Sequence, residues 1–337
     1  CFPFRLCLEA YGRRNVPEKN GEFSVFGASG YIGSVDFYQQ GYPYVAVVKD
    51  GAGIGRAMLC PGKTSVIGTM QYLLPKDNIL PKYLFYVVKY MNLEKYFTGA
   101  TIPHIYFKDY KNEEFNFDFW ERQVEIVSVL SKCEKVIDLC KQELQLLDKL
   151  IKARFVELFG DPVSNSYGLP EATLPDLGEF GRGVSKHRPR NDIKLLGGKY
   201  PLIQTGDVAN AGLYITSYSS TYSELGLKQS KMWDKGTLCI TIAANIAKTA
   251  ILEFDACFPD SVVGFIANER TNNIFVHYWF SFFQAILESQ APESAQKNIN
   301  LKILSELKVI VPEKRKQDQF ASFVKLTDKS KVAVRKY

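Results

Sequence analysis

A heptad pattern of apolar residues over 119–159 constrains this chain more than any other feature. Leucine and isoleucine recur every seven residues, cysteine and leucine fill most interleaved positions, and neither Pro nor Gly interrupts the run. The pattern is typical of a coiled-coil seam, and it predicts a helical rod about 60 Å long. The predicted seam comprises Leu130, Cys133, Ile137, Cys140, Leu144, Leu147, Ile151 and Leu158, with Phe320, Phe323 and Val324 facing it from a C-terminal helix. The alternative is a long core helix of a single domain.

Length, charge and cysteine content limit the kinds of protein to which this chain can belong. A chain of 337 residues predicts about two domains. The net charge of +6 permits a polyanionic partner without requiring one. Seven cysteines without a CxxC pair, and three histidines without suitably spaced ligands, predict reduced thiols and no metal site. The longest uncharged apolar stretch, 276–287, is too short to cross a bilayer, and no signal pattern opens the chain. We therefore expect no membrane partner and a cytoplasmic location.

The two halves of the chain show the same order of elements. Short aromatic and β-branched strands precede an aromatic helix in each half. A shift of 194 residues places Gln123 on Gln317 and Ile126 on Phe320, and near the start of the chain the shift falls to 177. A duplicated unit is the simplest explanation, and chance matching of similar helices is the alternative.

The repeat and the heptads together predict an architecture. We expect an α+β protein in which two similar units of mixed strands and short helices are joined by long helices. Two such helices can pack as an antiparallel coiled coil with approximate two-fold symmetry. The predicted divisions are a first unit at 1–117, a central helix at 118–160, a second unit at 163–308 and a C-terminal helix at 312–337.

Two glycine-containing segments resemble phosphate-binding loops. Gly27, Gly30 and Gly33 are spaced like the glycines of a short-chain dehydrogenase, which would bind NAD(P). Residues 34–43 are too short and broken for the crossover helix that such a fold needs. The segment 57–64 matches a loose P-loop, but Pro61 removes one amide and Gly68 interrupts the helix that should follow. A turn between strands explains these residues better, so we expect no cofactor.

A basic segment at 182–194 is the main candidate for contact with a polyanion. It holds five Lys or Arg residues and His187 against one acid, and a basic stretch near the N-terminus takes the equivalent place in the first half. Such cations would neutralise phosphates while polar side chains read base edges; the alternative is a solvated surface loop. Gln204, Thr205 and Asp207, at a junction of strand and turn, are weaker candidates, and capping of the turn is the alternative role for Asp207. The candidate DNA-contacting residues are Arg13, Arg14, Lys19, Lys49, Lys63, Arg182, Lys186, His187, Arg188, Arg190, Lys194, Gln204 and Thr205.

Three segments of this sequence resemble a known family. YPLIQTGDV at 200–208, VFGASGYIGSVD at 25–36 and the stretch from Asn300 to Phe320 are similar to segments of the specificity (S) subunit of type I restriction-modification systems. The resemblance implies two target recognition domains that each read half of a bipartite site in double-stranded DNA. It also implies a coiled coil that sets the unread spacer and docks methyltransferase (M) subunits, with restriction (R) subunits joining the assembly.

The resemblance further implies that the subunit is not itself catalytic, and no set of Ser, His and Asp residues can be placed convincingly as a catalytic site. Against the family pattern we expect the first domain to lack its opening strand and the C-terminal helix to be truncated. Two rival functions remain open, which are a dehydrogenase-type enzyme and a coiled-coil assembly protein without DNA specificity.

Overall fold

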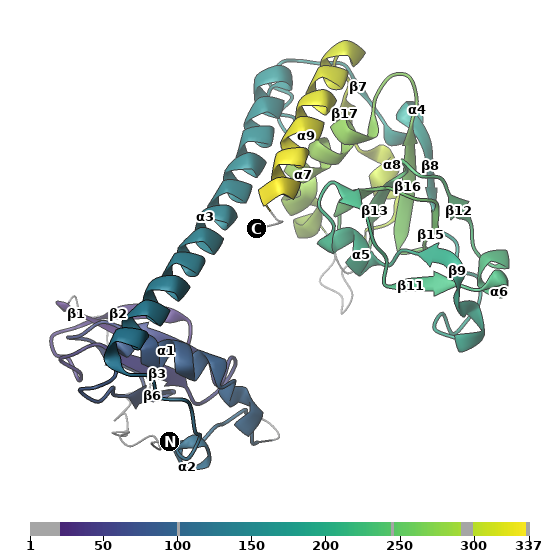
Figure 1. The fold of residues 1–337 in the computed structure, drawn as a ribbon. Coiled ribbons are helices and arrows are strands. Elements are labelled where there is room, and N and C mark those ends of the chain that lie inside the picture. The colour runs from purple at the N-terminus through teal and green to yellow at the C-terminus, as the bar shows by residue number, and fades with distance from the viewer. Residues whose placement is uncertain (1–20, 100–101, 244–245, 291–298, 335–337) are drawn as a thin grey trace. The chain divides into compact units, whose positions relative to one another are not determined.

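The computed structural model describes residues 21–99, 102–243, 246–290 and 299–334. The chain divides into two units, Cys1–Ile137 (unit 1) and Asp138–Tyr337 (unit 2). Helix α3 (Trp120–Phe159) contributes its first part to unit 1 and its last part to unit 2 (Figure 1). It lies within the helix predicted at 118–160, and it ends at Gly160, whose φ of +75° favours glycine after a helix.

Unit 1 contains two small sheets. One has the strand order β2-β1-β5 and the other β4-β3-β6. All five residues of β3 are buried, and alternate side chains enter two different clusters, so β3 is the centre of this unit. The strands are β1 (Phe23–Gly27), β2 (Gly30–Val35), β3 (Tyr44–Val48), β4 (Ala57–Cys60), β5 (Ser65–Val66) and β6 (Met70–Leu73).

Helix α1 (Pro81–Tyr90) covers one face of the β3 sheet. The sequence pattern predicts a longer helix, over 81–97, but Asn92 adopts a left-handed conformation with φ of +51° and the chain continues as a 3₁₀ turn, Leu93–Tyr96. A short helix α2 (Phe107–Tyr110) precedes α3.

Unit 2 contains a five-stranded sheet, a four-stranded sheet and a two-stranded ribbon. Their strand orders are β10-β14-β13-β16-β8, β11-β9-β15-β12 and β17-β7. The strands are β7 (Glu171–Ala172), β8 (Gly178–Arg182), β9 (Leu196–Leu202), β10 (Tyr214–Ile215), β11 (Ser220–Tyr222), β12 (Met232–Trp233), β13 (Leu238–Thr241), β14 (Thr249–Leu252), β15 (Ala256–Cys257), β16 (Val262–Ala267) and β17 (Val309–Ile310). The short helices of this unit are α4 (Leu174–Leu177), α5 (Thr205–Asn210), α6 (Glu224–Lys228) and α8 (Leu301–Glu306), with a 3₁₀ turn at Ile193–Leu195.

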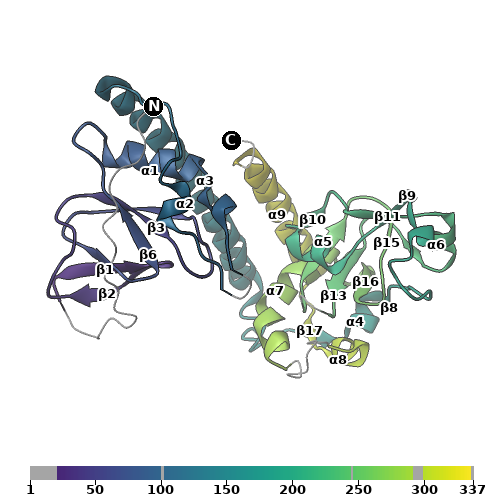
Figure 2. The same ribbon diagram turned by 90° about the horizontal axis from the view of Figure 1, so that it is seen from below.

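Three helices of unit 2 share one aromatic core. Helix α7 (Asn273–Gln290) lies between α9 (Lys314–Val334) and the five-stranded sheet (Figure 2). The rings of Phe155 and Phe159, both fully buried, lie 5.3 and 5.7 Å from the ring of Phe320 on α9. Asp148 bonds to Lys331 of α9. The second contact lies eleven residues nearer the N-terminus of α3 than Phe159 and eleven residues nearer the C-terminus of α9 than Phe320. The two helices therefore run antiparallel.

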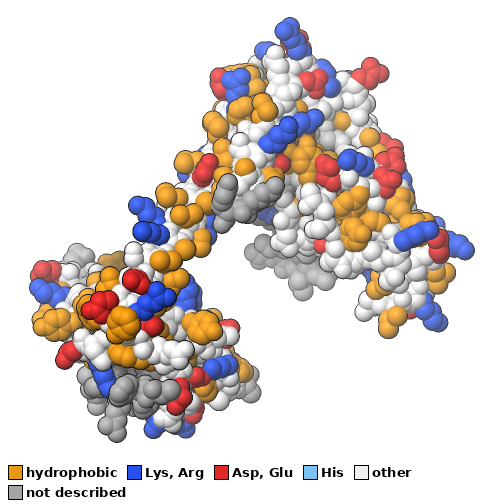
Figure 3. Space-filling view, viewed as in Figure 1, with side chains coloured by type: hydrophobic (Ala, Val, Ile, Leu, Met, Phe, Trp, Pro, Cys, Tyr) orange, Lys and Arg blue, Asp and Glu red, His pale blue; other side chains and the backbone are white. Residues whose placement is uncertain are grey.

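The predicted seam is covered along only part of its length. Ile151, Phe320 and Val324 are fully buried, and Leu144, Leu147, Leu158 and Phe323 are partly buried. Towards the start of α3, Leu130 is 37% exposed and Ile137 is 50% exposed, and Cys133 is also exposed. Figure 3 shows orange side chains along this part of the helix. The coiled-coil seam over the first half of α3 therefore stays a prediction.

Two buried glutamines, Gln123 and Gln317, each donate to two backbone carbonyls and accept one hydrogen bond. Gln123 Nε2 donates to the carbonyls of Asn78 and Asp118 at 3.0 and 2.8 Å, and its Oε1 accepts from Leu80 N at 2.9 Å. Gln317 Nε2 donates to the carbonyls of Arg270 and Pro312 at 3.0 and 2.9 Å, and its Oε1 accepts from Thr271 Oγ1 at 2.9 Å. In each unit the glutamine thus ties the first turn of a long helix to the residues just before an aromatic helix.

Replacing either glutamine by leucine should loosen its own unit and leave the other unchanged. Each change removes the side-chain amide that donates to two carbonyls, and since these bonds are partly or fully buried we expect a cost of about 1 to 3 kcal/mol. In hydrogen exchange followed by mass spectrometry, Gln123→Leu should accelerate exchange at 78–88, and Gln317→Leu at 270–280. Gln142→Leu, at an exposed position of α3, is the matched control. Equal exchange in all three variants would contradict this assignment.

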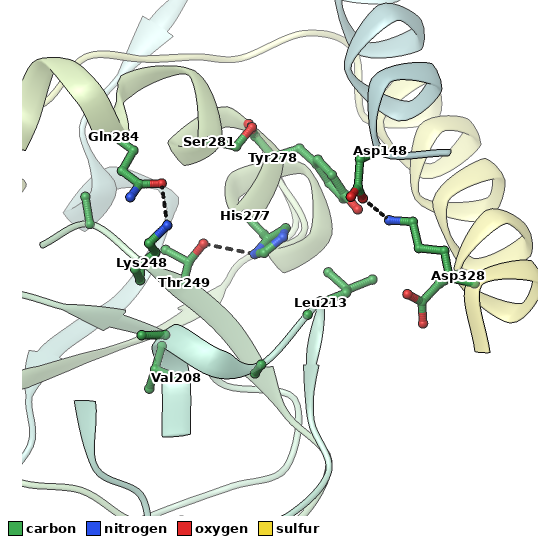
Figure 4. Close-up of a pocket in the computed structure, with 15 residues that line it drawn as sticks. Asp148, Val208, Leu213, Lys248, Thr249, His277, Tyr278, Ser281, Gln284 and Asp328 are labelled. Atoms are coloured by element: carbon green, nitrogen blue, oxygen red, sulfur yellow. Dashed lines mark hydrogen bonds and ion pairs between the residues drawn. The ribbon is translucent and has the colours of Figure 1, made fainter. Parts of the chain in front are cut away.

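A polar cavity of about 260 Å³ lies beside the aromatic core of unit 2 (Figure 4). Lys331, whose side chain is 9% exposed, bonds to Asp148 here, while Lys248 Nζ donates to Gln284 Oε1 at 3.2 Å. Thr249 Oγ1 lies 2.9 Å from His277 Nδ1. Burial, and secondarily the nearby Lys331 ammonium, lowers the pKa of His277 to about 4. This histidine is therefore neutral near pH 7.

Unit 2 should lose stability as the pH falls from about 6.5 to about 4. In this window the unfolded chain binds a proton at His277 that the folded chain does not, so acid favours unfolding. We expect a loss on the order of 2 kcal/mol across the window. Urea unfolding of the wild type and of His277→Asn between pH 5 and pH 7 measures it. The variant should show a shallower pH dependence, and identical slopes would contradict the prediction.

Candidate nucleic-acid interface

The basic segment at 182–194 forms a surface loop between β8 and β9, and its arginines meet one acid. Arg182, the last residue of β8, donates from Nε to the carbonyl of Asp260 at 2.9 Å. Arg188 Nη2 lies 3.5 Å from Asp260 Oδ2, and Arg190 Nη2 bonds to Asp260 Oδ1. Asp260 belongs to the turn between β15 and β16. The fold thus gathers three guanidinium groups around this turn.

Further hydrogen bonds hold the loop in shape. Arg188 Nη1 donates to the carbonyls of Ser185 and His187 at 2.6 and 2.9 Å. His187 Nε2 lies 3.1 Å from Asp192 Oδ2, and Lys194 N donates to Asp192 Oδ1 at 3.0 Å. The Lys194 amide, and then His187, hold the pKa of Asp192 below its ordinary value. These bonds orient the cations before any ligand arrives, which reduces the cost of ordering them on binding.

The charge of this loop is positive after its internal pairs are counted. Arg182, Lys186, Arg188, Arg190 and Lys194 face two acids, Asp192 and Asp260, which leaves three positive charges. The side chains of Lys186 and Lys194 are exposed, and neither pairs with a carboxylate among the residues that the structure describes. Arg188 and Arg190 share the single carboxylate of Asp260, and Arg182 donates to the backbone carbonyl of that residue, so each arginine keeps N–H groups that could bind a phosphate. The loop can therefore accept several anionic oxygens, as phosphates would provide.

Gln204 and Thr205 lie at the other end of β9 from this loop. Gln204 is the N-cap of α5, and its backbone N–H donates to Asp207 Oδ2 at 2.7 Å. Asp207 thus takes part in capping α5, the alternative role given to it from the sequence. Leu202, two residues before Gln204, pairs with Cys257, three residues before Asp260. Among the described residues, however, no hydrogen bond or ion pair joins Gln204 or Thr205 to Arg182, Arg188 or Arg190. A role for Gln204 and Thr205 in base contact stays a prediction.

Two candidate residues of unit 1, Lys49 and Lys63, lie in the part of the chain that the structure describes, and they do not lie together. Lys49 follows the end of β3, where its backbone bonds to Thr69 and Ile105. Lys63 is exposed in the turn after β4, which lies at the opposite end of the β3–β4 hairpin. Arg13, Arg14 and Lys19 lie outside the described residues. A DNA-contacting surface in unit 1 is therefore a prediction without a described cluster.

Sequence reasoning missed Asp260 and Gln229. Asp260 is 70 to 78 residues from the arginines it contacts. Gln229 Oε1 accepts from His187 N at 3.0 Å. The segment Pro259-Asp260-Ser261 reads only as a turn between strands. Strand pairing of β8 with β16, in which Arg182 faces Val263, is what brings the two loops together. No local sequence signal indicates that pairing.

The two phosphate-loop alternatives do not fit the fold. Gly27 ends β1 and Gly30 begins β2, and the two strands form an antiparallel hairpin instead of a strand, loop and helix. Ala57–Cys60 is strand β4, and β5 begins at Ser65, so no helix N-terminus follows Lys63. In the described ranges no group of three or more potential metal ligands occurs. Nor does any helix there have the length and apolar character needed to span a membrane.

Comparison with known proteins gives consistent matches. The family model for the type I restriction modification DNA specificity domain matches residues 12–149 and 171–336. A Methanocaldococcus jannaschii protein assigned as the type I restriction enzyme MjaX specificity subunit is 22% identical over 292 residues, which covers 82% of this chain and 68% of that protein. The MjaIX specificity subunit of the same organism is 26% identical over 179 residues, or 48% of this chain and 40% of that protein.

A solved structure shares the fold. The crystal structure of a type I restriction-modification system S subunit from M. genitalium superposes with a TM-score of 0.59 at 18% identity, covering 94% of this chain and 84% of that one. The likeness bears out the mixed α+β fold over most of the chain. Because the family model covers most of the sequence in two stretches, the chain belongs to the type I restriction modification DNA specificity domain family.

Proposed function

We propose that this chain recognises a bipartite sequence in double-stranded DNA, with one half read by each unit. The observation that carries the proposal for unit 2 is the arginine cluster around Asp260, which presents ordered cations on an exposed loop. The chain's family is defined by DNA specificity. Phosphate contacts from the loop supply affinity, and polar side chains of the same unit supply sequence preference.

The long helices act as the spacer in this proposal. Residues 1–117 and 163–308 are the two recognition domains, and 118–160 with 312–337 form an antiparallel coiled coil. The described packing of the end of α3 on α9 supports the antiparallel arrangement in unit 2. Methyltransferase and restriction subunits dock on this frame, and the chain supplies no catalytic group. The proposal includes an approximate two-fold symmetry between the two recognition domains, which would suit two half-sites on one duplex.

The alternatives differ in what they bind. A dehydrogenase-type enzyme is disfavoured by the β1–β2 hairpin, which leaves no helix N-terminus for a pyrophosphate. A coiled-coil assembly protein without DNA specificity would need the same helices, but an ordered arginine cluster on a loop gives it no advantage.

Reconstitution with a methyltransferase subunit tests the proposal. The complex should methylate a random DNA library at one split sequence with a fixed gap. Binding of the chain to labelled duplexes should weaken as salt is added, since phosphate contacts release counterions. Methylation without sequence preference, or binding that ignores salt, would overturn the assignment in favour of an assembly protein.

A further inference from the structure

The polar cavity of unit 2 holds charged groups that DNA recognition does not use. Its volume is about 260 Å³, and water occupies roughly 30 Å³ per molecule in the liquid, so a small organic molecule can fit inside. Most of its polar side chains come from α7 and α9. Val208, from α5, and Ala211 and Leu213, from the segment after α5, supply an apolar wall. The cavity therefore suits a ligand with a polar head and a short apolar body.

Lys248 carries a positive charge that no acid of the cavity neutralises. Its Nζ donates to the amide oxygen of Gln284 at 3.2 Å, and it forms no ion pair with a carboxylate among the residues that the structure describes. Lys331, in contrast, is paired with Asp148. An ammonium group has three N–H donors, so Lys248 has two left for a ligand within the described part of the chain.

His277 adds a neutral hydrogen-bonding group to the same cavity. Its Nδ1 lies 2.9 Å from the hydroxyl of Thr249, the residue that follows Lys248. Nε2 makes no hydrogen bond to the residues described here. Burial, and then the Lys331 ammonium, lowers the pKa of His277 to about 4, so the ring is neutral near pH 7. When Nδ1 accepts from the Thr249 hydroxyl, Nε2 carries the proton and can donate to a ligand.

The acids of the cavity limit the charge of that ligand. Asp328 lies on the far side of His277 from Lys248 (Figure 4). Burial, and then the nearby Asp328 and Asp148, raises the pKa of the Tyr278 hydroxyl, which lines the cavity between them. Two lysines and two aspartates leave the cavity without net charge. A monoanion held at Lys248 is therefore favoured over a dianion, which the two carboxylates would repel more strongly.

We propose that this cavity binds a small organic carboxylate of a few carbon atoms. Its carboxylate accepts hydrogen bonds from Lys248 Nζ and His277 Nε2, and its carbon chain lies against Val208 and Leu213. Inorganic phosphate has no apolar body and carries more than one negative charge near pH 7, so it binds more weakly. The site does not depend on DNA binding, because its residues are separate from the arginine cluster around Asp260.

Butyrate serves as the probe, and butyramide, which has the same shape without the charge, is its control. The chain has three histidines, His104, His187 and His277, so NMR of the whole chain labelled with ¹⁵N-histidine reports on three places at once. Butyrate should move the His277 signal saturably, with a Kd on the order of 1 mM for so small a ligand. The signals of His104 and His187 should stay in place, and His277→Asn assigns the third signal.

Three variants test which groups hold the probe. Lys248→Met removes the ammonium but keeps an unbranched side chain, and it should weaken butyrate binding about 10- to 100-fold. Lys329→Met, at an exposed position of α9 that does not line the cavity, is the matched control and should bind butyrate normally. Asp328→Asn removes a carboxylate that repels butyrate without removing a cation, so it should strengthen binding. Unchanged His104 and His187 signals show that each variant is folded.

Several results would overturn the proposal. These are no movement of the His277 signal, an equal response to butyrate and butyramide, or equal butyrate binding by the wild type and a folded Lys248→Met chain. Movement of the His187 signal in place of His277 would also overturn it, because butyrate would then bind at the arginine cluster. Tighter binding of inorganic phosphate than of butyrate would contradict both the charge and the apolar body assigned to the ligand.

Discussion

Alanine at both Arg188 and Arg190 is expected to weaken the binding of duplex DNA about 10- to 100-fold near physiological salt. The two guanidinium groups are exposed and share one carboxylate, so each has N–H groups left for a phosphate. The slope of log affinity against log salt should also fall by nearly two, because about one counterion is released for each phosphate contact. Fluorescence anisotropy with a labelled duplex at several salt concentrations measures both quantities.

A lysine double variant and a variant of Asp260 distinguish the loss of specific phosphate contacts from a general effect of removing positive charge. The double variant Lys235→Ala, Lys302→Ala removes two exposed cations that lie away from the loop and pair with Glu253 and Glu306. Its affinity for DNA should change little. Asp260→Asn removes the acid that competes with DNA for the arginines, so non-specific affinity should rise while discrimination between sequences falls. If the arginine and lysine double variants lost DNA affinity equally, the loop would not be part of the DNA-binding surface.

Insertion of four residues after Lys141 should abolish site recognition or change the length of the unread gap. The insertion adds about 6 Å of helix and rotates the residues on its two sides by about 40° relative to each other. It lies before Asp148, Phe155 and Phe159, so the packing of α3 on α9 within unit 2 is retained. Methylation of a random library by the reconstituted complex reports the gap between the two half-sites directly.

The matched control keeps the helix length constant. Lys141, Gln142 and Glu143 are exposed, and their replacement by alanine should leave the gap unchanged. An insertion of seven residues lengthens the helix by about 10 Å with only a small rotation, so it should favour a longer gap over complete loss. If the four-residue insertion left site selection unchanged, α3 would not set the spacing.

The regular elements were largely predictable from sequence because their signals are local. Forty residues without Pro or Gly form α3, and runs of aromatic and β-branched residues mark strands such as β3. Where the prediction of 81–97 as one helix is wrong, a single Asn at positive φ ends α1. The buried part of α3 was only partly predicted. Phe155 and Phe159 fall outside the strict heptad positions, and the geometry of α7 and α9 selects them instead of Arg154.

The sequence predicts the positive charge of the candidate interface, but it does not predict which residues lie together there. The count of cations over 182–194 is visible in the sequence, yet the role of Asp260 depends on pairing between β8 and β16. Similarly, the shift of 194 aligns Gln123 with Gln317, but only the folded chain shows that both side chains bridge the same kind of carbonyls. Contacts between residues far apart in sequence account for what could not be predicted.

The ribbon of β7 and β17 has a consequence for how such proteins diversify. Ala172 pairs with Val309 and Glu171 with Ile310, so the chain enters and leaves the body formed by residues 173–308 at adjacent points. A recombination event with both crossovers at this ribbon would exchange the body as a cassette. The helices before and after it would keep their sequences, so a new specificity could arise on an old frame in one genetic step.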